Sequence, residues 1–277
     1  MTTLIAWVGV DSQRIGSVYI ASDSRITWMD HGDHWDSTQK VFSSRDYPEI
    51  FGYSGRSEFA VHTMQQLISH IDDNCLIAIS DSFDLKMQKV ISFLDEKVHS
   101  LSAKRRGTGT IIYATRIGIK MESVFHVAEI KFGKDGLTWV EVELPSESGV
   151  VAKAGTGAAI HDSINKEWGI HDKLVKDKKL GYIKKGYSRF VFSSLCEAIM
   201  NEHDKYTGGA PQLVGLYKHN PGLNFGVIFN RKRYLSGKEI SCSQAKATNV
   251  EWRNQLFELC DGESMERLDG AQKQPRC

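Results

Sequence analysis

The chain opens with two apolar runs that are separated by a short polar segment. The runs cover residues 4–10 and 17–22, and the residues between them include Asp11, Arg14 and Gly16. Apolar runs that flank a polar, glycine-containing segment predict a β-hairpin with a long turn. We therefore expect a strand to begin close to the N-terminus.

Two segments in the first half of the chain repeat apolar residues with the period of a helix. In the first, Met64, Leu67, Ile68 and Ile71 stand at positions i, i+3, i+4 and i+7. After a polar break at residues 72–74, the same period returns at Met87, Val90, Ile91, Leu94, Val98 and Leu101. The pattern predicts two amphipathic helices, and an apolar surface must cover each stripe.

The rest of the chain up to residue 229 alternates between strand and helix patterns. A short strand that ends in a glycine turn is expected at 48–55, a glycine-separated antiparallel meander at 110–114, 123–127 and 137–142, helices near 160–164 and 191–199, and strands at 212–217 and 225–229. This order of strands, two helices, strands, two helices and strands predicts an α+β fold. Two antiparallel sheets would pack face to face, with helices on both outer faces.

The C-terminal part carries weaker signals. We expect one domain over residues 1–237 and an extension over 238–277 that is partly helical, with a polar, disordered end at 270–275. The apolar positions of the expected helix are Val250, Trp252, Leu256, Phe257 and Leu259. A basic connection between the third and fourth helices is expected to be a solvated loop rather than a docking patch; it contains Lys173, Lys176, Lys178, Lys179, Lys184, Lys185 and Arg189.

Composition narrows the class of protein. With 277 residues and 41% hydrophobic content the chain can bury a sizeable core, and its net charge of +1 gives no reason to expect nucleic acid or a membrane as partner. No signal peptide or membrane span is visible, and five cysteines without C-x-x-C spacing argue against disulfides and zinc. We expect a cytoplasmic protein without a cofactor. The histidines and aspartates of residues 30–36 could bind metal, but a solvated loop is the simpler interpretation.

The N-terminus carries candidate chemistry. If Met1 is removed, Thr2 has both a hydroxyl and a free α-amine, whose pKa is about 7.7–8.0, so that it can accept the hydroxyl proton near neutral pH. Asp23 and Lys40 follow the first hairpin. A lysine beside the hydroxyl would assist its deprotonation. On these residues alone, a frayed strand end and a solvated lysine are the simpler interpretation.

Several further segments, in the order in which they occur, favour the catalytic interpretation over a frayed strand end. Residues 2–6, 21–27, 40–41 and 52–55 resemble the opening of a proteasome β-subunit or of its HslV-type bacterial relative. Downstream, Ala154-Gly155-Thr156-Gly157 resembles the family's glycine-serine-glycine turn, and Asp204-Lys205-Tyr206-Thr207-Gly208-Gly209 resembles its Asp-x-x-Ser-Gly segment. The similarity spans about residues 2–235. The chain is thereby identified as resembling a threonine peptidase of the N-terminal-nucleophile hydrolase superfamily, with that family's four-layer αββα sandwich.

The resemblance also implies roles for individual residues. Thr2 would attack the peptide carbonyl, Lys40 held by Asp23 would lower the hydroxyl's pKa, and the N–H of Gly55 would stabilise the oxyanion. Thr156, Asp204 and Thr207 would hold the α-amine and a water. Tyr53 would form the floor of the pocket for the acyl-side residue, with Arg25 and Arg56 as further substrate-binding residues.

Two departures from the family are noticeable, besides a longer first hairpin. A threonine replaces the usual serine at Thr156, which keeps the hydroxyl, and Arg56 stands where active members commonly have a second glycine. The cation of Arg56 is expected to affect specificity or access.

Three functions stay open at this point: an active threonine peptidase, a catalytically silent structural subunit, and an amidase that cleaves a small amide. The complete set of catalytic residues argues against the silent subunit. For the peptidase we expect peptide or unfolded protein as substrate, a homo-oligomeric ring that restricts access, and an ATPase unfoldase as a further partner. The helices over residues 64–71 and 87–101, whose stripes the sheets need not fully cover, are the expected contact surfaces of that ring.

Overall fold

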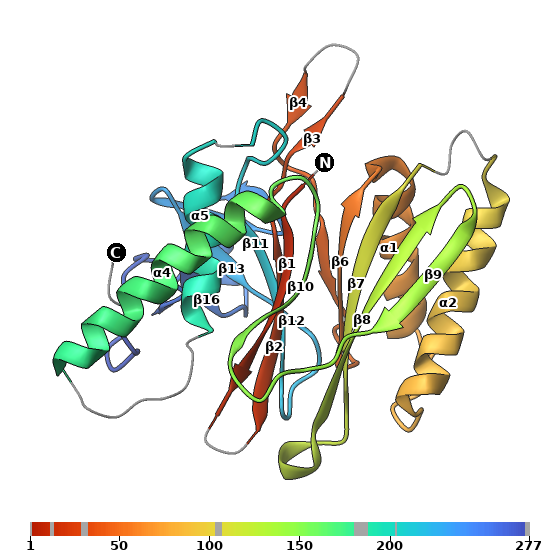
Figure 1. Cartoon of the computed structure of the whole chain (residues 1–277), viewed down its shortest axis with the longest axis horizontal. Helices are drawn as coiled ribbons and strands as arrows, with labels where there is room; N and C mark the ends of the chain where they lie inside the picture. The colour runs from red at the N-terminus through yellow and green to blue at the C-terminus, as the bar shows by residue number, and fades with distance from the viewer. Residues whose placement is uncertain are drawn as a thin grey trace.

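The computed structural model describes residues 2–11, 14–28, 33–102, 107–179, 188–202 and 204–274 (Figure 1). The described chain forms three five-stranded sheets and one two-stranded sheet, with helices packed against the larger sheets. The fold is therefore a mixed α+β arrangement of largely antiparallel sheets. None of the described helices combines the length and the apolar character that crossing a membrane requires.

The first sheet contains the N-terminal hairpin. Strands β1 (Leu4–Val10) and β2 (Ile15–Ser22) pair antiparallel, which confirms the hairpin predicted from the two apolar runs. β10 (Gly149–Ala154) pairs with the free edge of β1, whereas β11 (Gln212–Tyr217) and β12 (Leu223–Asn224) extend the sheet beyond β2. The start of β1 and the end of β2 lie side by side, because Leu4 is paired with Ser22.

The second sheet is the predicted meander with two strands ahead of it. Its order is β5 (Val41–Ser43), β6 (Glu49–Gly55), β7 (Gly109–Ile117), β8 (Val124–Gly133) and β9 (Gly136–Glu141). All neighbouring strands are antiparallel. The change from helical to strand period near residue 108 is thus confirmed.

An apolar layer joins the facing sides of these two sheets. Leu4, Ala6 and Val8 of β1 point into it, whereas Ile5 and Trp7 point to the opposite face of the strand. This alternation follows from the two-residue period of a strand. The second sheet contributes Val41, Ile50, Ile112, Ala114, Phe125 and Val127 to the same layer.

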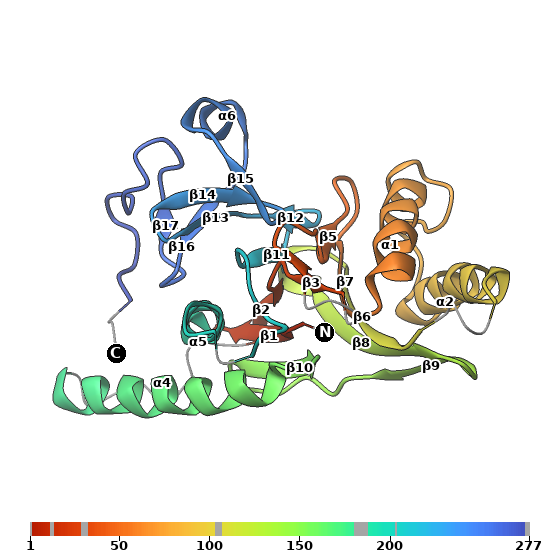
Figure 2. The ribbon, with the colours of Figure 1, turned by 90° about the horizontal axis from the view of Figure 1, so that it is seen from above.

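Helices α1 (Ser57–Asp72) and α2 (Phe83–Ser100) cover the other face of the second sheet (Figures 1 and 2). Both helices were predicted from their apolar stripes. The expectation that the sheets would leave part of these stripes uncovered is wrong. The sheet and the two helices bury them almost completely, at Met64, Leu67, Ile71, Met87, Val90, Leu94 and Val98.

Two further helices lie on the outer side of the first sheet (Figure 2). α5 (Arg189–Met200) packs directly on it, where Phe192 stacks against Trp7, and α4 (Ala158–Lys179) packs on α5 through Ile164 and Trp168. The basic connection is therefore helical up to Lys179, not a loop as expected. Lys184 and Lys185 lie outside the described residues.

The third sheet was not predicted. Its order is β15 (Lys238–Ile240), β14 (Lys232–Leu235), β13 (Gly226–Phe229), β16 (Trp252–Asn254) and β17 (Leu259–Cys260). β13, expected in one of the two main sheets, therefore belongs here. The C-terminal part has one short helix, α6 (Cys242–Ala247), ahead of β16. The boundary expected after residue 237 falls inside the β14–β15 hairpin.

The amphipathic helix expected around residues 250–259 is wrong. β16 runs parallel to β13 with Trp252 opposite Gly226, and Phe257 has a φ of +60°, which a right-handed helix excludes. Residues 270–274 are also ordered against the domain rather than detached. The side chain of Gln274 is buried, and its backbone N–H donates to Glu258 Oε1 at 2.7 Å.

A small hairpin projects beyond the ends of the sheets at the top of Figure 1. It consists of β3 (Ile26–Thr27) and β4 (His34–Trp35), which pair antiparallel. At the opposite end of the second sheet, the 3-10 helix η1 (Lys120–Glu122) joins β7 to β8. The small hairpin starts directly after the end of β2, which places it beside the N-terminus.

Candidate active site

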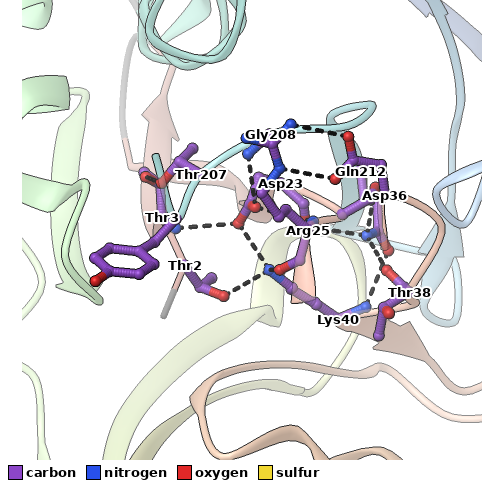
Figure 3. Close-up of polar contacts among 12 residues, drawn as sticks. Thr2, Thr3, Asp23, Arg25, Asp36, Thr38, Lys40, Thr207, Gly208 and Gln212 are labelled. Atoms are coloured by element: carbon purple, nitrogen blue, oxygen red, sulfur yellow. Dashed lines mark hydrogen bonds and ion pairs between the residues drawn. The ribbon is translucent and has the colours of Figure 1, made fainter. Parts of the chain in front are cut away.

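Three chain segments meet at the end of the first sheet where β1 starts. Thr2 and Thr3 precede β1, Asp23 follows β2, and Lys40 immediately precedes β5. The antiparallel register of β1 and β2 places Asp23 next to Thr3, and the packing of the two sheets places Lys40 next to both. Figure 3 shows the side chains of Thr2, Asp23 and Lys40 directed toward one another.

Lys40 is the centre of this group. Its ammonium donates to Thr2 Oγ1 at 2.6 Å, to Asp23 Oδ1 at 3.0 Å and to the carbonyl oxygen of Arg25 at 2.5 Å. The three N–H donors of Nζ thus have three acceptors, one of which is the predicted nucleophile. The side chain is 1% exposed, and this burial lowers the pKa of Lys40, against the opposing effect of the charge on Asp23.

Asp23 is held by backbone groups as well as by the lysine. Oδ1 accepts from the N–H of Thr3 at 3.1 Å, and Oδ2 accepts from the N–H groups of Arg25 at 3.0 Å and Gly208 at 3.1 Å. With Lys40, the buried carboxylate has four donors from four parts of the chain. Its position is therefore fixed without any contribution from solvent.

Gln212, at the start of β11, was not predicted as a site residue. Its Oε1 accepts from the N–H of Lys40 at 3.0 Å, and its Nε2 donates to the carbonyl oxygens of Asp23 at 3.1 Å and Thr38 at 2.7 Å. Nε2 also lies 2.9 Å from Ser24 Oγ. The fully buried amide therefore ties the backbone of the lysine to the backbone of the aspartate. In the sequence, the one indication of this role is that a polar glutamine stands at the start of an otherwise apolar strand.

A second polar cluster lies next to the nucleophile. Asp204 Oδ2 accepts from Thr156 Oγ1 at 2.6 Å and from Thr207 Oγ1 at 3.0 Å, so the structure brings the three predicted residues together. Thr207 Oγ1 also lies 2.8 Å from Thr3 Oγ1. Thr3, which was not predicted, thus connects this cluster to the residue that follows the nucleophile.

The glycine turn carrying Thr156 packs on the backbone of Thr2. Gly157 donates its N–H to the carbonyl oxygen of Thr2 at 3.4 Å. Gly155 has a φ of +93°, and a Cβ there would come within 1.8 Å of the same oxygen. Only glycine allows this approach at position 155.

The backbone N–H of Gly55 is directed toward the same side as Lys40. The carbonyl oxygen of Ser54 points to β7, since it lies 2.5 Å from the position of a Cβ on Gly109. In a trans peptide the following N–H points the opposite way. The N–H of Tyr53, two residues earlier, donates to the Lys40 carbonyl at 3.0 Å on that side. Gly55 is therefore placed to donate toward a group bound near Lys40.

The three predicted substrate-binding residues are placed differently. The Arg25 guanidinium forms a bidentate ion pair with Asp36, at 2.8 and 2.9 Å, and thereby lowers the pKa of that carboxyl. Tyr53 is buried in the core under α1, where its ring stacks on Phe42 with the ring centroids 6.4 Å apart. Arg56 is exposed ahead of α1. Arg25 and Tyr53 thus face protein groups, and only Arg56 faces solvent.

A cavity of about 690 Å³ opens beside the site. Thr38 and Gln39, directly ahead of Lys40, form its inner side, and Trp28 and Trp35 of the small hairpin form one wall. Within the described ranges, no three histidine, cysteine, aspartate or glutamate side chains are grouped as metal ligands. Residues 30–32 of the loop considered for a metal lie outside the described part.

Comparisons with known proteins give little at the level of sequence. No family model matches the chain, and no curated protein matches it. Among solved structures, it is similar to the crystal structure of eukaryotic HslV from Trypanosoma brucei, with a TM-score of 0.45 and 13% identity over 77% of this chain and 99% of that chain. This similarity is too weak to assign roles to individual residues, so the roles of the site residues are argued from their geometry alone.

Proposed function

We propose that this protein is an N-terminal threonine hydrolase that cleaves peptide bonds. The observation that carries the proposal is the position of Lys40 Nζ between Asp23 Oδ1 and Thr2 Oγ1, at 3.0 and 2.6 Å. A buried ammonium that donates to a hydroxyl stabilises the alkoxide relative to the alcohol. The hydroxyl belongs to the residue that becomes the N-terminus when Met1 is removed.

In the proposed reaction, Thr2 Oγ1 attacks the substrate carbonyl while its proton passes to the α-amine, directly or through a water. The N–H of Gly55 donates to the oxyanion that forms. When the C–N bond breaks, the proton goes to the leaving amine and an ester to Thr2 remains. Water, deprotonated by the same amine, then hydrolyses the ester and restores the hydroxyl. The hydroxyls and carboxylate of Thr156, Asp204 and Thr207 would orient that water and the amine, which is supported by the contact of Thr207 with Thr3 and by the packing of the glycine turn on the Thr2 carbonyl.

Processing of the N-terminus is part of the proposal. With Met1 attached, the Thr2 nitrogen is an amide without basicity. Thr2 is also only 2% exposed in the chain that retains Met1. The proposal therefore requires that removal of Met1 both frees the amine and opens a path to Oγ1.

We also propose the four-layer αββα arrangement and a closed ring that restricts access to the site. The shared apolar layer between the two main sheets and the helices on their outer faces support the first. The ring would need contact surfaces other than the buried stripes of α1 and α2. Peptides or unfolded proteins would be the substrates, and an unfoldase could supply them. An amidase with the same nucleophile remains the alternative, while the complete set Thr2, Asp23, Lys40, Asp204 and Thr207 disfavours a silent subunit.

A covalent trap combined with intact mass tests the proposal. A β-lactone that acylates hydroxyl nucleophiles should add its mass to the N-terminal peptide of a chain that starts at Thr2 and should stop cleavage of a fluorogenic peptide. Thr2→Ala should abolish both results, whereas Thr2→Ser should retain activity. Cleavage by a preparation in which every chain retains Met1 would refute the mechanism. Native mass then separates the alternatives, because a ring favours the peptidase and a fully active monomer favours the amidase.

A further inference from the structure

The cavity beside the site is closed on one side by the C-terminal sheet. Leu235, Ser236, Lys238 and Ile240 of the β14–β15 hairpin line it, as do residues of the small β3–β4 hairpin. The first turns of α1 contribute Val61 and His62. Chain segments about 200 residues apart in the sequence thus build one cavity next to Lys40.

The turn of the β14–β15 hairpin is anchored to the catalytic group itself. Gly237 has a φ of +82°, and a Cβ there would lie 2.6 Å from Ser24 Oγ and 3.0 Å from Gln212 Nε2. Ser24 follows Asp23, and Gln212 holds the backbone of both Asp23 and Lys40. The hairpin therefore has a fixed position relative to the nucleophile, as a specificity wall requires.

The lining of the cavity combines large apolar residues with polar ones, and Lys238 is the lysine or arginine among those that the described part of the chain contributes. Its large apolar members are Ile26, Trp28, Trp35, Val61, Leu235 and Ile240. Lys238 is exposed at the wall, and in the described part of the chain no carboxylate belongs to the lining or pairs with this lysine. An apolar ligand group would gain from burial there, whereas a cationic one would meet Lys238 without a compensating acid.

The inner side of the cavity carries a hydroxyl group that makes no hydrogen bond within the described part of the chain. Thr38 is 3% exposed and lines the cavity, and its Oγ1 has no hydrogen-bond partner among the described residues. A buried hydroxyl without a partner is costly unless a bound group or solvent satisfies it. This is an observation independent of the apolar walls, and it also points to a ligand.

We propose that the β14–β15 hairpin is the specificity-determining wall of this cavity, and that the cavity selects a bulky apolar side chain on the acyl side of the cut and rejects lysine and arginine. The inference rests on the proposed hydrolase function and extends it to the substrate class. It gives the C-terminal sheet a direct part in substrate selection. Lys238 supplies the repulsive element, and Trp28 and Trp35 supply the attractive surface.

The test is a set of fluorogenic tetrapeptides that differ only in the residue before the cut, which is leucine, phenylalanine, alanine or lysine. The wild-type chain should cleave the leucine and phenylalanine peptides with a kcat/KM at least about tenfold above that of the lysine peptide. Lys238→Glu should raise the ratio of lysine to leucine cleavage by about three- to tenfold, because a repulsion becomes an attraction. Trp35→Ala should lower kcat/KM for phenylalanine more than for alanine.

Lys131→Glu is the matched control. Lys131 is an exposed lysine on β8 that does not line the cavity, so the same change of charge should leave the lysine-to-leucine ratio at its wild-type value. An unchanged ratio in Lys238→Glu, or an equal change in Lys131→Glu, would overturn the inference while leaving hydrolysis by Thr2 intact.

Binding to the Thr2→Ala chain separates this inference from the proposed function. Calorimetry with the uncleaved leucine and lysine peptides reports selectivity without turnover. Preference for leucine that Lys238→Glu reduces would support the cavity assignment even if the wild-type chain cleaves no peptide. Equal binding of both peptides would refute the cavity assignment, whatever the activity.

Discussion

Lys40 and Thr2 are 38 positions apart in the sequence, yet the lysine Nζ donates a 2.6 Å hydrogen bond to the threonine Oγ1. The same ammonium is fixed by Asp23, and all three residues are almost fully buried. A charge in such surroundings acts on the hydroxyl with little screening by water. This relationship makes Thr2 unlike an ordinary threonine at the start of a strand.

Lys40→Met tests that relationship, because methionine keeps most of the length and removes the charge. We expect kcat to fall by at least about 100-fold, the order of magnitude seen when one electrostatic donor is removed from an active site. The fold should persist, since Asp23 retains its three backbone N–H donors. Activity on a fluorogenic peptide and far-UV circular dichroism measure the two effects.

Lys86→Met is the control for burial of the charge. Lys86 is a second fully buried lysine, and it donates to Glu49 Oε1 at 2.6 Å between α2 and β6. Its loss should lower the free energy of unfolding and leave kcat of the folded protein within about threefold of wild type. Equal losses of kcat in both variants would mean that Lys40 acts only through stability.

Gln212 is expected to act as a positioning residue. Gln212→Ala leaves the N–H of Lys40 and the carbonyl oxygens of Asp23 and Thr38 without their partner. We expect the free energy of unfolding to fall by about 2–4 kcal/mol and kcat to fall with little change in KM, because the lysine is displaced rather than removed. Denaturant unfolding and full kinetics measure both. A kcat equal to that of wild type would show that the amide is only structural.

The sequence predicts the main strands and helices well where the pattern is local. The hairpin of β1 and β2, the meander of β7, β8 and β9, and helices α1 and α2 all follow from periodicity within one segment. The third sheet does not, because β13 and β16 pair in parallel across the chain and the apolar spacing around Trp252 also suits a helix. The positive φ of Phe257, which lies between β16 and β17, has no signal in its residue type.

The site residues divide in the same way into those that a local motif predicts and those that depend on distant parts of the chain. Thr2, Asp23, Lys40 and Gly55 were predicted because short motifs mark them in order, and the structure brings Thr2, Asp23 and Lys40 into contact. Gln212 and Thr3 were missed, since their roles arise only from partners distant in the sequence. Motif matching also gives no direction to a side chain, so it could not place Arg25 against Asp36, or Tyr53 in the helix-facing core.

Tyr53 gives a prediction that follows from its position in the core. Its ring is 1% exposed and its hydroxyl has no partner among the described residues, and burial raises the pKa of the phenol far above its usual value. Tyr53→Phe should therefore leave the free energy of unfolding unchanged or higher, whereas Tyr53→Ala should lower it by about 3–5 kcal/mol through the cavity it leaves. Denaturant unfolding measures this. A changed cleavage profile in Tyr53→Phe would instead place the hydroxyl at the substrate.

The last prediction concerns acid stability and a buried histidine behind the glycine turn. His161 in α4 is fully buried, with Nε2 at 3.1 Å from the carbonyl oxygen of Val191 and 2.9 Å from Ser194 Oγ, whereas Nδ1 has no partner in the described chain. Burial lowers the pKa of His161 to about 4. The neutral ring is thus the form that the packing of α4 on α5 accommodates.

The sign of the pH dependence follows from that shift. Unfolded histidine has a pKa of about 6.5, so between pH 6.5 and 4 the unfolded chain binds a proton that the folded chain does not, and stability falls as the pH is lowered. The loss should approach about 3 kcal/mol near pH 4 and level off below it.

His161→Gln cannot titrate, so the difference in unfolding free energy between wild type and variant, measured by urea at several pH values from 4 to 7, isolates this effect from the carboxylates. The backbone N–H of His161 donates to the carbonyl oxygen of Gly157 at 3.0 Å, so α4 continues directly from the glycine turn. Activity on a fluorogenic peptide should therefore fall together with this stability in the wild type, and less steeply in the variant. Parallel pH profiles in the two proteins would show that the pKa of His161 is the same in the folded and unfolded chains.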